Sequence, residues 1–168
     1  TAFKKVVAAI GLSEAIDAAL LWDDTALVEE FINGIEVTCG VLGHHPAVPL
    51  IPSETVPTSE ILSLEDKFLY GQGENKTPAR LPEQVLANIQ ATAVLTFVSL
   101  DLKGYARIDM FVRDNGQIVV LEPNTLPGMT PSTVLFHQAA AVGITQAELI
   151  ERIIDYALEA HHDKRGPL

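Results

Sequence analysis

The chain has 168 residues, of which 48% are hydrophobic, and a mean hydropathy of +0.23, which suffices for one ordinary core. Its formal net charge of -11 and its lack of a basic patch exclude a duplex-binding surface, so we expect no nucleic-acid partner. The apolar runs are much shorter than a bilayer span and no signal peptide is evident, so we expect a cytoplasmic protein with no membrane partner. The single cysteine, Cys39, excludes an intrachain disulfide.

The N-terminal half is predicted to contain a helix, a hairpin, a short strand and two loops. Ser13 is the expected N-cap of the helix, and Asn33-Gly34 is a strong signal for the hairpin turn. The expected ranges are 13–22 for the helix, 26–32 and 35–42 for the hairpin strands, 48–51 for the short strand, and 53–63 and 71–77 for the loops.

The C-terminal half is predicted to contain a long helix, a second hairpin, an irregular segment and two helices. Pro82 is expected at the first helical position, Gly143 at the end of the penultimate helix, and a capping box from Thr145 to Glu148 at the start of the last. The expected ranges are 82–100, 106–112 with 117–124, 124–131, 132–142 and 145–161. Mixed strands and helices in this order favour an α+β fold over a parallel doubly wound sheet.

The second hairpin carries two carboxylates that are expected to face each other. If Asn115-Gly116 forms a two-residue type I′ turn, Asp109 lies opposite Glu122 and Arg107 lies opposite Asn124. Period-2 alternation then puts all four side chains on one face. Like charges directly opposite each other are unfavourable, and a divalent cation with a preference for oxygen ligands would reverse that. The alternative is a solvated hairpin face with a local salt bridge.

The first hairpin is expected to gather two acids and an aromatic ring on one face. With Asn33-Gly34 as its turn, Phe31 faces Glu36 and Glu29 faces Thr38. Such a face could accept hydrogen bonds from an amine and from sugar hydroxyls. The alternative is an ordinary half-exposed hairpin.

Two further positions are candidates for contacts with anions. Lys67 lies in or beside a long loop, from which a lysine could reach a phosphate, although it is equally compatible with an ordinary surface position. Thr133 lies at the start of a predicted helix, where unpaired backbone N–H groups attract anions.

Several stretches, in this order, resemble the C-terminal part of the D-alanine–D-alanine ligases, an ATP-grasp family. The last stretch is the most specific, because it combines the paired acids with Asn-Thr-Leu-Pro-Gly-Met-Thr. The matching segments are 28–37, 65–68, 78–82, 104–109 and 121–130. The resemblance implies an ATP-grasp fold with an antiparallel sheet and flanking helices. It also implies an ATP-dependent ligase that joins two D-alanines through an acyl phosphate for peptidoglycan precursor synthesis.

The resemblance also assigns roles to individual residues. Two Mg²⁺ (or Mn²⁺) ions would be held by Asp109, Glu122 and Asn124, with ATP as co-substrate. The other implied roles are adenine binding by Glu29, Phe31 and Ile32, ribose binding by Glu36, phosphate contact by Lys67, acyl-phosphate stabilisation by Arg107, an oxyanion contact by the Gly128 amide, and binding of the second D-alanine carboxylate by Thr133 and Val134.

The resemblance further implies that residues 1–168 are an incomplete ATP-grasp domain without the family's N-terminal domain. The isolated chain would then have little or no activity, and the full-length protein would be a homodimer that binds D-alanine and ATP. Two alternatives stay open at this point. One is another ATP-grasp ligase, such as a D-alanine–D-lactate ligase, and the other is a non-catalytic nucleotide-binding module.

Overall fold

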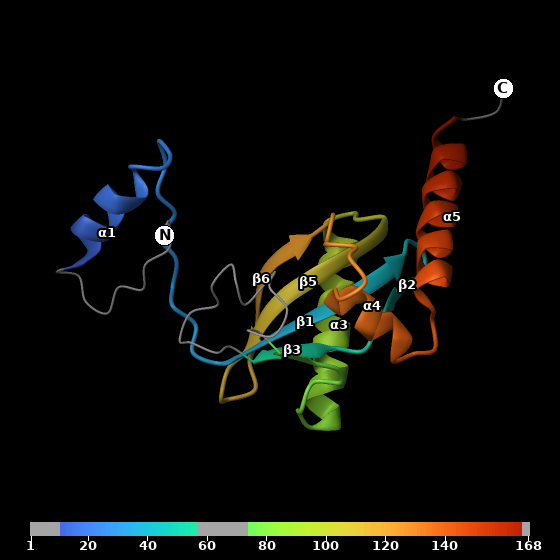
Figure 1. Cartoon of the computed structure of the whole chain (residues 1–168), viewed down its shortest axis with the longest axis horizontal. Coiled ribbons are helices and arrows are strands. Elements are labelled where there is room, and N and C mark those ends of the chain that lie inside the picture. The colour runs from blue at the N-terminus through green and yellow to red at the C-terminus, as the bar shows by residue number, and fades with distance from the viewer. Residues whose placement is uncertain (1–10, 57–73, 166–168) are drawn as a thin grey trace. The chain divides into compact units, whose positions relative to one another are not determined.

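The structure of the chain, a computed structural model, describes residues 11–56 and 74–165 (Figure 1). Contacts divide the chain into two compact units, one that ends at Ile32 and one that begins at Asn33. The first unit contains α1, Leu12–Ala19, followed by an irregular segment. Gly11 is the N-cap of α1 and no side chain caps it, so the prediction of Ser13 as the cap is wrong.

The predicted hairpin about Asn33-Gly34 is wrong, because residues 26–32 form no strand. Both edges of the following strand, β1 (Ile35–Gly43), are taken by other partners: β5 pairs along one edge, and β3 and β2 share the other. Gly34 has a different reason to be glycine. A β carbon there would overlap the carbonyl oxygen of Val112 and lie 2.9 Å from its carbonyl carbon, so the residue allows a close approach to β5.

The second unit is built on a six-stranded sheet in which every pairing is antiparallel. Its order is β4-β3-β1-β5-β6, and β2 pairs with β1 beside β3. The remaining strands are β2 (Ala47–Pro49), β3 (Ser53–Val56), β4 (Glu74–Lys76), β5 (Gly104–Val112) and β6 (Ile118–Asn124).

Two of these strands, β3 and β4, occupy segments that were predicted to be loops. Their polar composition conceals them, and in β3 buried polar side chains are paired rather than solvated. Glu54 is buried and forms an ion pair with Arg80, while the Ser53 hydroxyl hydrogen-bonds that of Thr77. A polar strand of this kind lacks the apolar alternation by which strands are recognised.

Helices cover the two faces of the sheet (Figure 1). α3 (Glu83–Ser99) packs on one face, and α4 (Val134–Ala140) and α5 (Gln146–Arg165) lie on the other. Pro82 is the N-cap of α3 rather than its first helical residue. The predicted stop at Gly143 is confirmed by its φ of +79°, and the Thr145 hydroxyl accepts from the Glu148 amide as a capping box requires.

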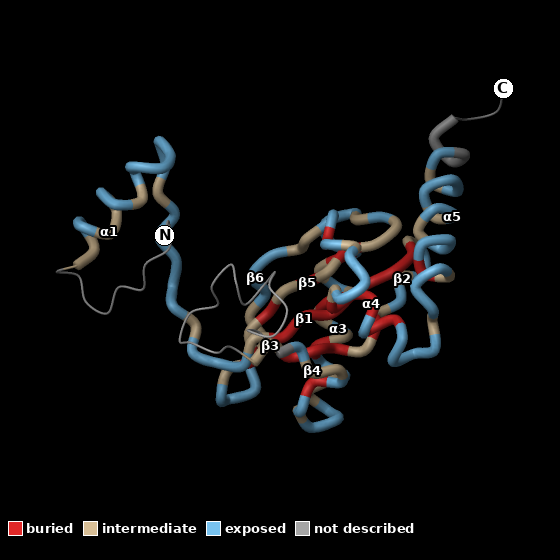
Figure 2. The backbone as a smooth tube through the Cα atoms, in the orientation of Figure 1, coloured by how far each residue is buried: buried red, intermediate tan, exposed pale blue. Residues whose placement is uncertain are grey.

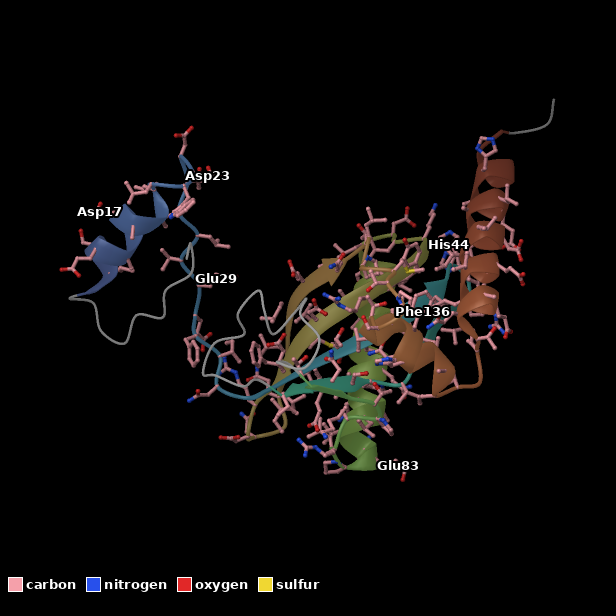
Figure 3. The ribbon with its side chains drawn as sticks, viewed as in Figure 1. Asp17, Asp23, Glu29, His44, Glu83 and Phe136 are labelled. Atoms are coloured by element: carbon pink, nitrogen blue, oxygen red, sulfur yellow. The ribbon has the colours of Figure 1, made fainter. Side chains whose placement is uncertain are left out.

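Each face of the sheet has its own apolar cluster, and the buried positions concentrate on the central strands (Figure 2). Alternation along β5 decides which side chains go where, because alternate positions from Ala106 to Val112 are fully or almost fully buried against α3. The opposite face carries Phe136 of α4 over the Leu42 end of β1 (Figure 3). None of the described helices combines the length and apolarity that a membrane crossing requires.

Replacement of Gly34 by alanine should lower the melting temperature of the full-length protein, because β5 backbone atoms must move to admit the new methyl group. Gly116→Ala is the reference, since Gly116 has a φ of +82° but open space around it, and its cost should be limited to backbone strain of about 1–2 kcal/mol. Calorimetry that finds Gly34→Ala no more destabilising than Gly116→Ala would contradict this account of the close approach.

The Cys39 thiol should be inert in the native protein. Its burial on β1 raises its pKa from 9.0 to about 12, so thiolate is scarce in the folded chain below pH 9 and reaches half of the population only near pH 12. Labelling of Cys39 by iodoacetamide, followed by peptide mapping, should therefore stay much slower in the folded chain than in the unfolded chain throughout the range from pH 7 to 9. In the urea-unfolded chain it should be fast and should accelerate over the same range, because the unfolded thiol ionises there.

Candidate functional site

The turn between β5 and β6 has three residues rather than two. The Arg113 amide donates to the Gln117 carbonyl (2.9 Å), and the Gly116 amide donates to the Arg113 carbonyl (2.8 Å). Gly116 adopts a positive φ, whereas Asn115 does not. A type I′ turn needs a positive φ at both central positions, so the predicted two-residue turn is wrong. The extra loop residue shifts the pairing of the two strands by one position next to the turn.

A β-bulge reverses this shift before the pairing reaches the carboxylates. Met110 pairs with Val120, whereas the adjacent Asp109 pairs with Glu122, so Leu121 is the extra residue on β6. The predicted pairs, Asp109 with Glu122 and Arg107 with Asn124, are therefore confirmed, and they share one face of the sheet. The predicted register is right because the extra loop residue and the bulge each shift the pairing by one residue, in opposite directions.

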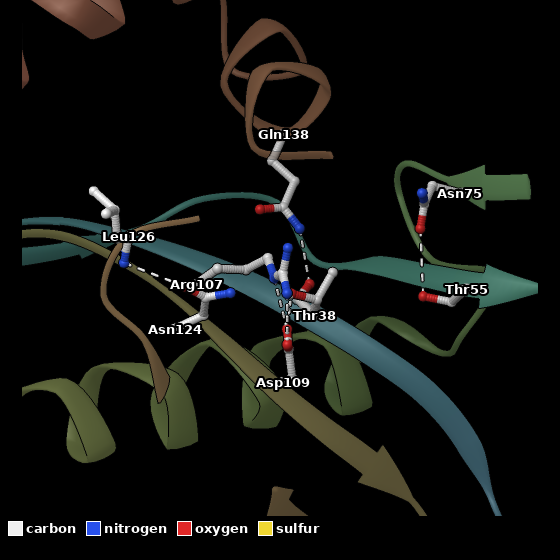
Figure 4. Close-up of polar contacts among 8 residues, drawn as sticks. All are labelled: Thr38, Thr55, Asn75, Arg107, Asp109, Asn124, Leu126 and Gln138. Carbon is white, nitrogen blue, oxygen red and sulfur yellow. Dashed lines mark hydrogen bonds and ion pairs between the residues drawn. The ribbon is translucent and has the colours of Figure 1, made fainter. Parts of the chain in front are cut away.

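The Asp109 carboxylate is held by three hydrogen bonds (Figure 4). Arg107 binds it in a bidentate manner, Nε to Oδ1 at 2.8 Å and Nη2 to Oδ2 at 2.7 Å, and the Thr38 hydroxyl donates to Oδ1 at 2.7 Å. The local salt bridge considered as an alternative for this hairpin is thus present. Thr38 pairs with Asp109 and Ser53 across β1, so the predicted pairing of Thr38 with Glu29 is wrong.

The Arg107 guanidinium is surrounded by negative charge. Its partial burial acts to lower its pKa, but the hydrogen bond to Asp109 and the charges of Asp109, Glu122 and Glu36 outweigh this and raise the pKa above its ordinary value. Arg107 is therefore a permanent cation, and three carboxylates lie within its electrostatic reach. Glu36, two residues before Thr38 on β1, shares the face of Asp109.

The segment after β6 folds back on itself. The Asn124 side-chain oxygen accepts from the Leu126 amide at 3.2 Å, which opens the predicted irregular segment. Thr133 is the N-cap of α4, whose first residue lies two positions later than the predicted helix start, and the Thr133 hydroxyl donates to the Thr130 carbonyl at 2.9 Å. A β carbon at Gly128 would lie 3.3 Å from the Thr133 methyl carbon, so these two predicted site residues are neighbours.

Other predicted site residues lie in the first unit or outside the described residues. Glu29 lies on the irregular segment after α1 (Figure 3) and belongs, with Phe31 and Ile32, to the first unit. Lys67 lies outside the described residues. Their roles stay predictions.

The donor set suits a hard cation. Asp109, Glu122 and Asn124 offer carboxylate and amide oxygens, the ligands that Mg²⁺ takes. In the part of the chain that the structure describes, no three His, Cys, Asp or Glu side chains cluster, so any site here rests on two carboxylates and an amide. Each carboxylate oxygen has about two acceptor positions. Asp109 Oδ1 uses both for Thr38 and Arg107, whereas Oδ2 uses one for Arg107 and keeps one for a cation.

Two residues that support this face, Thr38 directly and Gln138 through Thr38, were not identified from the sequence as functional candidates. Thr38 was considered only as a neighbour of Glu29, and Gln138 was not singled out. The available signal for Gln138 was its amide in the segment from Val134 to Ala140, which is apolar except for His137 and Gln138. The structure buries Gln138 completely, where an uncharged polar side chain needs buried partners.

Comparison with known proteins decides the family. The sequence model described as "D-ala D-ala ligase C-terminus" matches residues 2–155. The chain belongs to the D-alanine–D-alanine ligase family. A D-alanine–D-alanine ligase from Acetivibrio thermocellus is 38% identical over 90% of this chain, which corresponds to 41% of the relative. The chain thus spans about two-fifths of the length of this curated relative.

Solved structures of ligases share the fold. The D-alanine–D-alanine ligase from Coxiella burnetii has a TM-score of 0.83 and 27% identity, covering 96% of this chain and 42% of its own. The VanG D-Ala:D-Ser ligase from Enterococcus faecalis has a TM-score of 0.82 and 30% identity, covering 92% and 45%. The Bacillus anthracis D-alanine–D-alanine ligase complexed with ATP has a TM-score of 0.79 and 27% identity, covering 96% and 52%. The predicted α+β class and ATP-grasp fold are confirmed.

Proposed function

We propose that the protein containing this chain is an ATP-dependent ligase that joins two D-alanines for peptidoglycan precursor synthesis. The observation that carries this is the pairing of Asp109 with Glu122 beside Arg107, in a chain that the family model matches over residues 2–155. We place the enzyme in the cytoplasm, since ATP and the amino acid are supplied there. The homodimer is proposed from the resemblance to the family. Residues 1–168 would be part of its ATP-grasp domain.

The proposed reaction has two steps. A carboxylate oxygen of one D-alanine attacks the terminal phosphorus of ATP, and ADP leaves. The amine nitrogen of the second D-alanine then attacks the carbonyl carbon, phosphate leaves and the amine loses a proton. Catalysis of such transfers consists mainly of positioning and charge neutralisation, so no nucleophile on the protein is required.

The oxygen-bearing face of the β5–β6 hairpin is assigned to the phosphates. Asp109, Glu122 and Asn124 would hold two magnesium ions, and magnesium bound there would neutralise phosphate charge. Arg107, a permanent cation on the same face, would stabilise charge on the phosphorylated carboxylate. The Gly128 amide would donate to the oxygen that becomes negative when the amine attacks.

The remaining residues are assigned to the nucleotide and the second amino acid. Support for a nucleotide comes from the Bacillus anthracis relative, which is described as complexed with ATP. Glu36 would receive ribose hydroxyls and Lys67 a phosphate, while Glu29 with the backbone of Phe31 and Ile32 would receive the adenine.

The second D-alanine carboxylate is assigned to Thr133 and Val134 at the start of α4. This assignment is supported by the contact between Gly128 and Thr133, which would bring the oxyanion contact beside the incoming amino acid. The Thr133 hydroxyl would exchange its hydrogen bond with Thr130 for one to that carboxylate.

A D-alanine–D-serine activity is the second candidate, because the similar VanG structure is described as a D-Ala:D-Ser ligase. The full-length protein, given ATP and Mg²⁺, should form D-alanyl-D-alanine from D-alanine alone. Parallel assays that add D-serine or D-lactate, across pH, would identify a different second substrate by mass spectrometry. Calorimetry that detects binding of an ATP analogue in a protein without ATP turnover would instead favour a non-catalytic nucleotide-binding module.

Glu122→Gln in the full-length protein should reduce turnover by about 100-fold or more, because it removes a charge from the cation site while the strand pairing survives. Asp114→Asn is the matched control, since it removes one charge from the exposed turn of the same hairpin and should leave the rate unchanged. A normal rate for Glu122→Gln, measured as phosphate release with D-alanine, would refute the assignment of Glu122.

Gly128→Ala should also slow dipeptide formation, by about tenfold, with little loss of stability. The added methyl group meets the Thr133 methyl at 3.3 Å, so both segments must separate slightly, and small misplacements of positioning groups are costly in rate. Gly143→Ala is the reference for a general effect of Gly→Ala replacement outside the site. Equal kcat values for Gly128→Ala and the wild type would contradict the proposed role of this segment.

A further inference from the structure

Gln138 of α4 is inserted into the edge of the sheet. Its side chain is 0% exposed, and all of its hydrogens are used: Nε2 donates to the Thr38 carbonyl at 2.8 Å and to the Ser53 hydroxyl at 3.1 Å. Its Oε1 accepts from the Gly40 amide at 2.8 Å. Figure 4 shows Gln138 directed from α4 toward Thr38, with Asp109 and Arg107 beyond. One amide therefore joins α4, β1 and β3.

The insertion fills a gap in strand pairing. On this edge of β1, β3 pairs as far as Thr38 and β2 pairs from Val41 onward. Gln138 supplies the missing acceptor for the Gly40 amide between them. Gly40 leaves room for this, because a β carbon there would lie 3.0 Å from Gln138 Oε1 and closer still to the side chains of Leu50 and Leu135, so these side chains would have to shift.

Thr38 transmits this restraint to the candidate cation site. Its carbonyl is bound by Gln138, and its hydroxyl donates to Asp109 Oδ1. Since Thr38 and Arg107 occupy both acceptor positions of Oδ1, the acceptor position that is left on the carboxylate belongs to Oδ2. The orientation of Asp109 thus depends on the Thr38 hydroxyl, and the place of that hydroxyl depends on Gln138.

We propose that Gln138 and Thr38 are positioning residues that act in series to present Asp109 Oδ2 to the divalent cation. This inference rests on the proposed function through the assignment of Asp109 as a cation ligand. Partners outside the ligand shell commonly change metal affinity by about 10–100-fold when they are removed. Gln138 acts through Thr38, so its contribution vanishes once the Thr38 hydroxyl is absent.

The test measures Mn²⁺ affinity of the full-length protein by electron paramagnetic resonance, with a non-hydrolysable ATP analogue present. Thr38→Val, which keeps the shape and removes the hydroxyl, should weaken Mn²⁺ binding by about tenfold, and Thr38→Ser should restore it. Gln138→Met should weaken binding as well. The double variant should bind as weakly as Thr38→Val alone, because residues acting in series are not additive.

Two control variants remove the same chemical groups on the opposite face of the sheet. Gln90→Met on α3 removes a hydrogen bond to the Leu50 carbonyl (3.0 Å), and Thr96→Val removes a hydroxyl bound to the Thr92 carbonyl (2.9 Å). Both should leave Mn²⁺ affinity unchanged, whatever they do to the melting temperature. If the role of Gln138 is purely structural, Gln138→Met should also leave Mn²⁺ affinity unchanged.

The outcomes separate this inference from the proposed function. If the wild-type protein makes no dipeptide, the proposed function is overturned. If the wild-type protein is active but Thr38→Val leaves its Mn²⁺ affinity unchanged, only the inference is overturned. Additive losses in the double variant also overturn it, since Gln138 would then act by another route. If Gln138→Met does not fold, Thr38→Val against Thr38→Ser still decides, because Gln138 is proposed to act only through Thr38.

Discussion

β1 and β5 pair without interruption from Ile35 with Val112 to Gly43 with Gly104, and the candidate site depends on this ladder. It places Thr38 opposite Asp109, so this carboxylate is restrained by Thr38 from the neighbouring strand as well as by Arg107 from its own strand. The ladder also separates two environments, because alternation gives one face of β5 to the apolar contact with α3. The opposite face of β5 can then carry charged side chains, among them Arg107 and Asp109.

The pairing of Asp109 with Glu122 was predictable, although not for the reason first given. Asn115-Gly116 correctly marks a hairpin, but it does not distinguish a two-residue turn from a three-residue turn with a left-handed glycine. The bulge at Leu121 has no signature in a single sequence, since it depends on how β6 packs along β5. The period-2 pattern alone decided the shared face, because slippage by one residue would have exposed the apolar set.

The errors of prediction share a physical cause. Segment 26–32 was predicted to be a strand beside the Asn33-Gly34 turn signal, but both edges of β1 are occupied by other strands, and that is a property of the whole sheet. β3 reads as a loop because Glu54 and Ser53 are polar, and only the folded chain brings Arg80 and Thr77 to them. The fold class and the acids of the hairpin could be predicted because they depend on composition and local sequence. Partners that are distant in the sequence, such as Gln138 for Gly40, could not be predicted in this way.

The fit between Gly40 and Gln138 constrains how this domain can be recombined with its relatives. The absence of a β carbon at Gly40 leaves room for the amide, and the Gly40 N–H needs that amide as its acceptor. A chimera that takes only β1 or only α4 from a relative without this pair therefore has either a crowded side chain or a buried donor without an acceptor. Residues 40 and 138 should therefore be exchanged together when a segment of this domain is grafted.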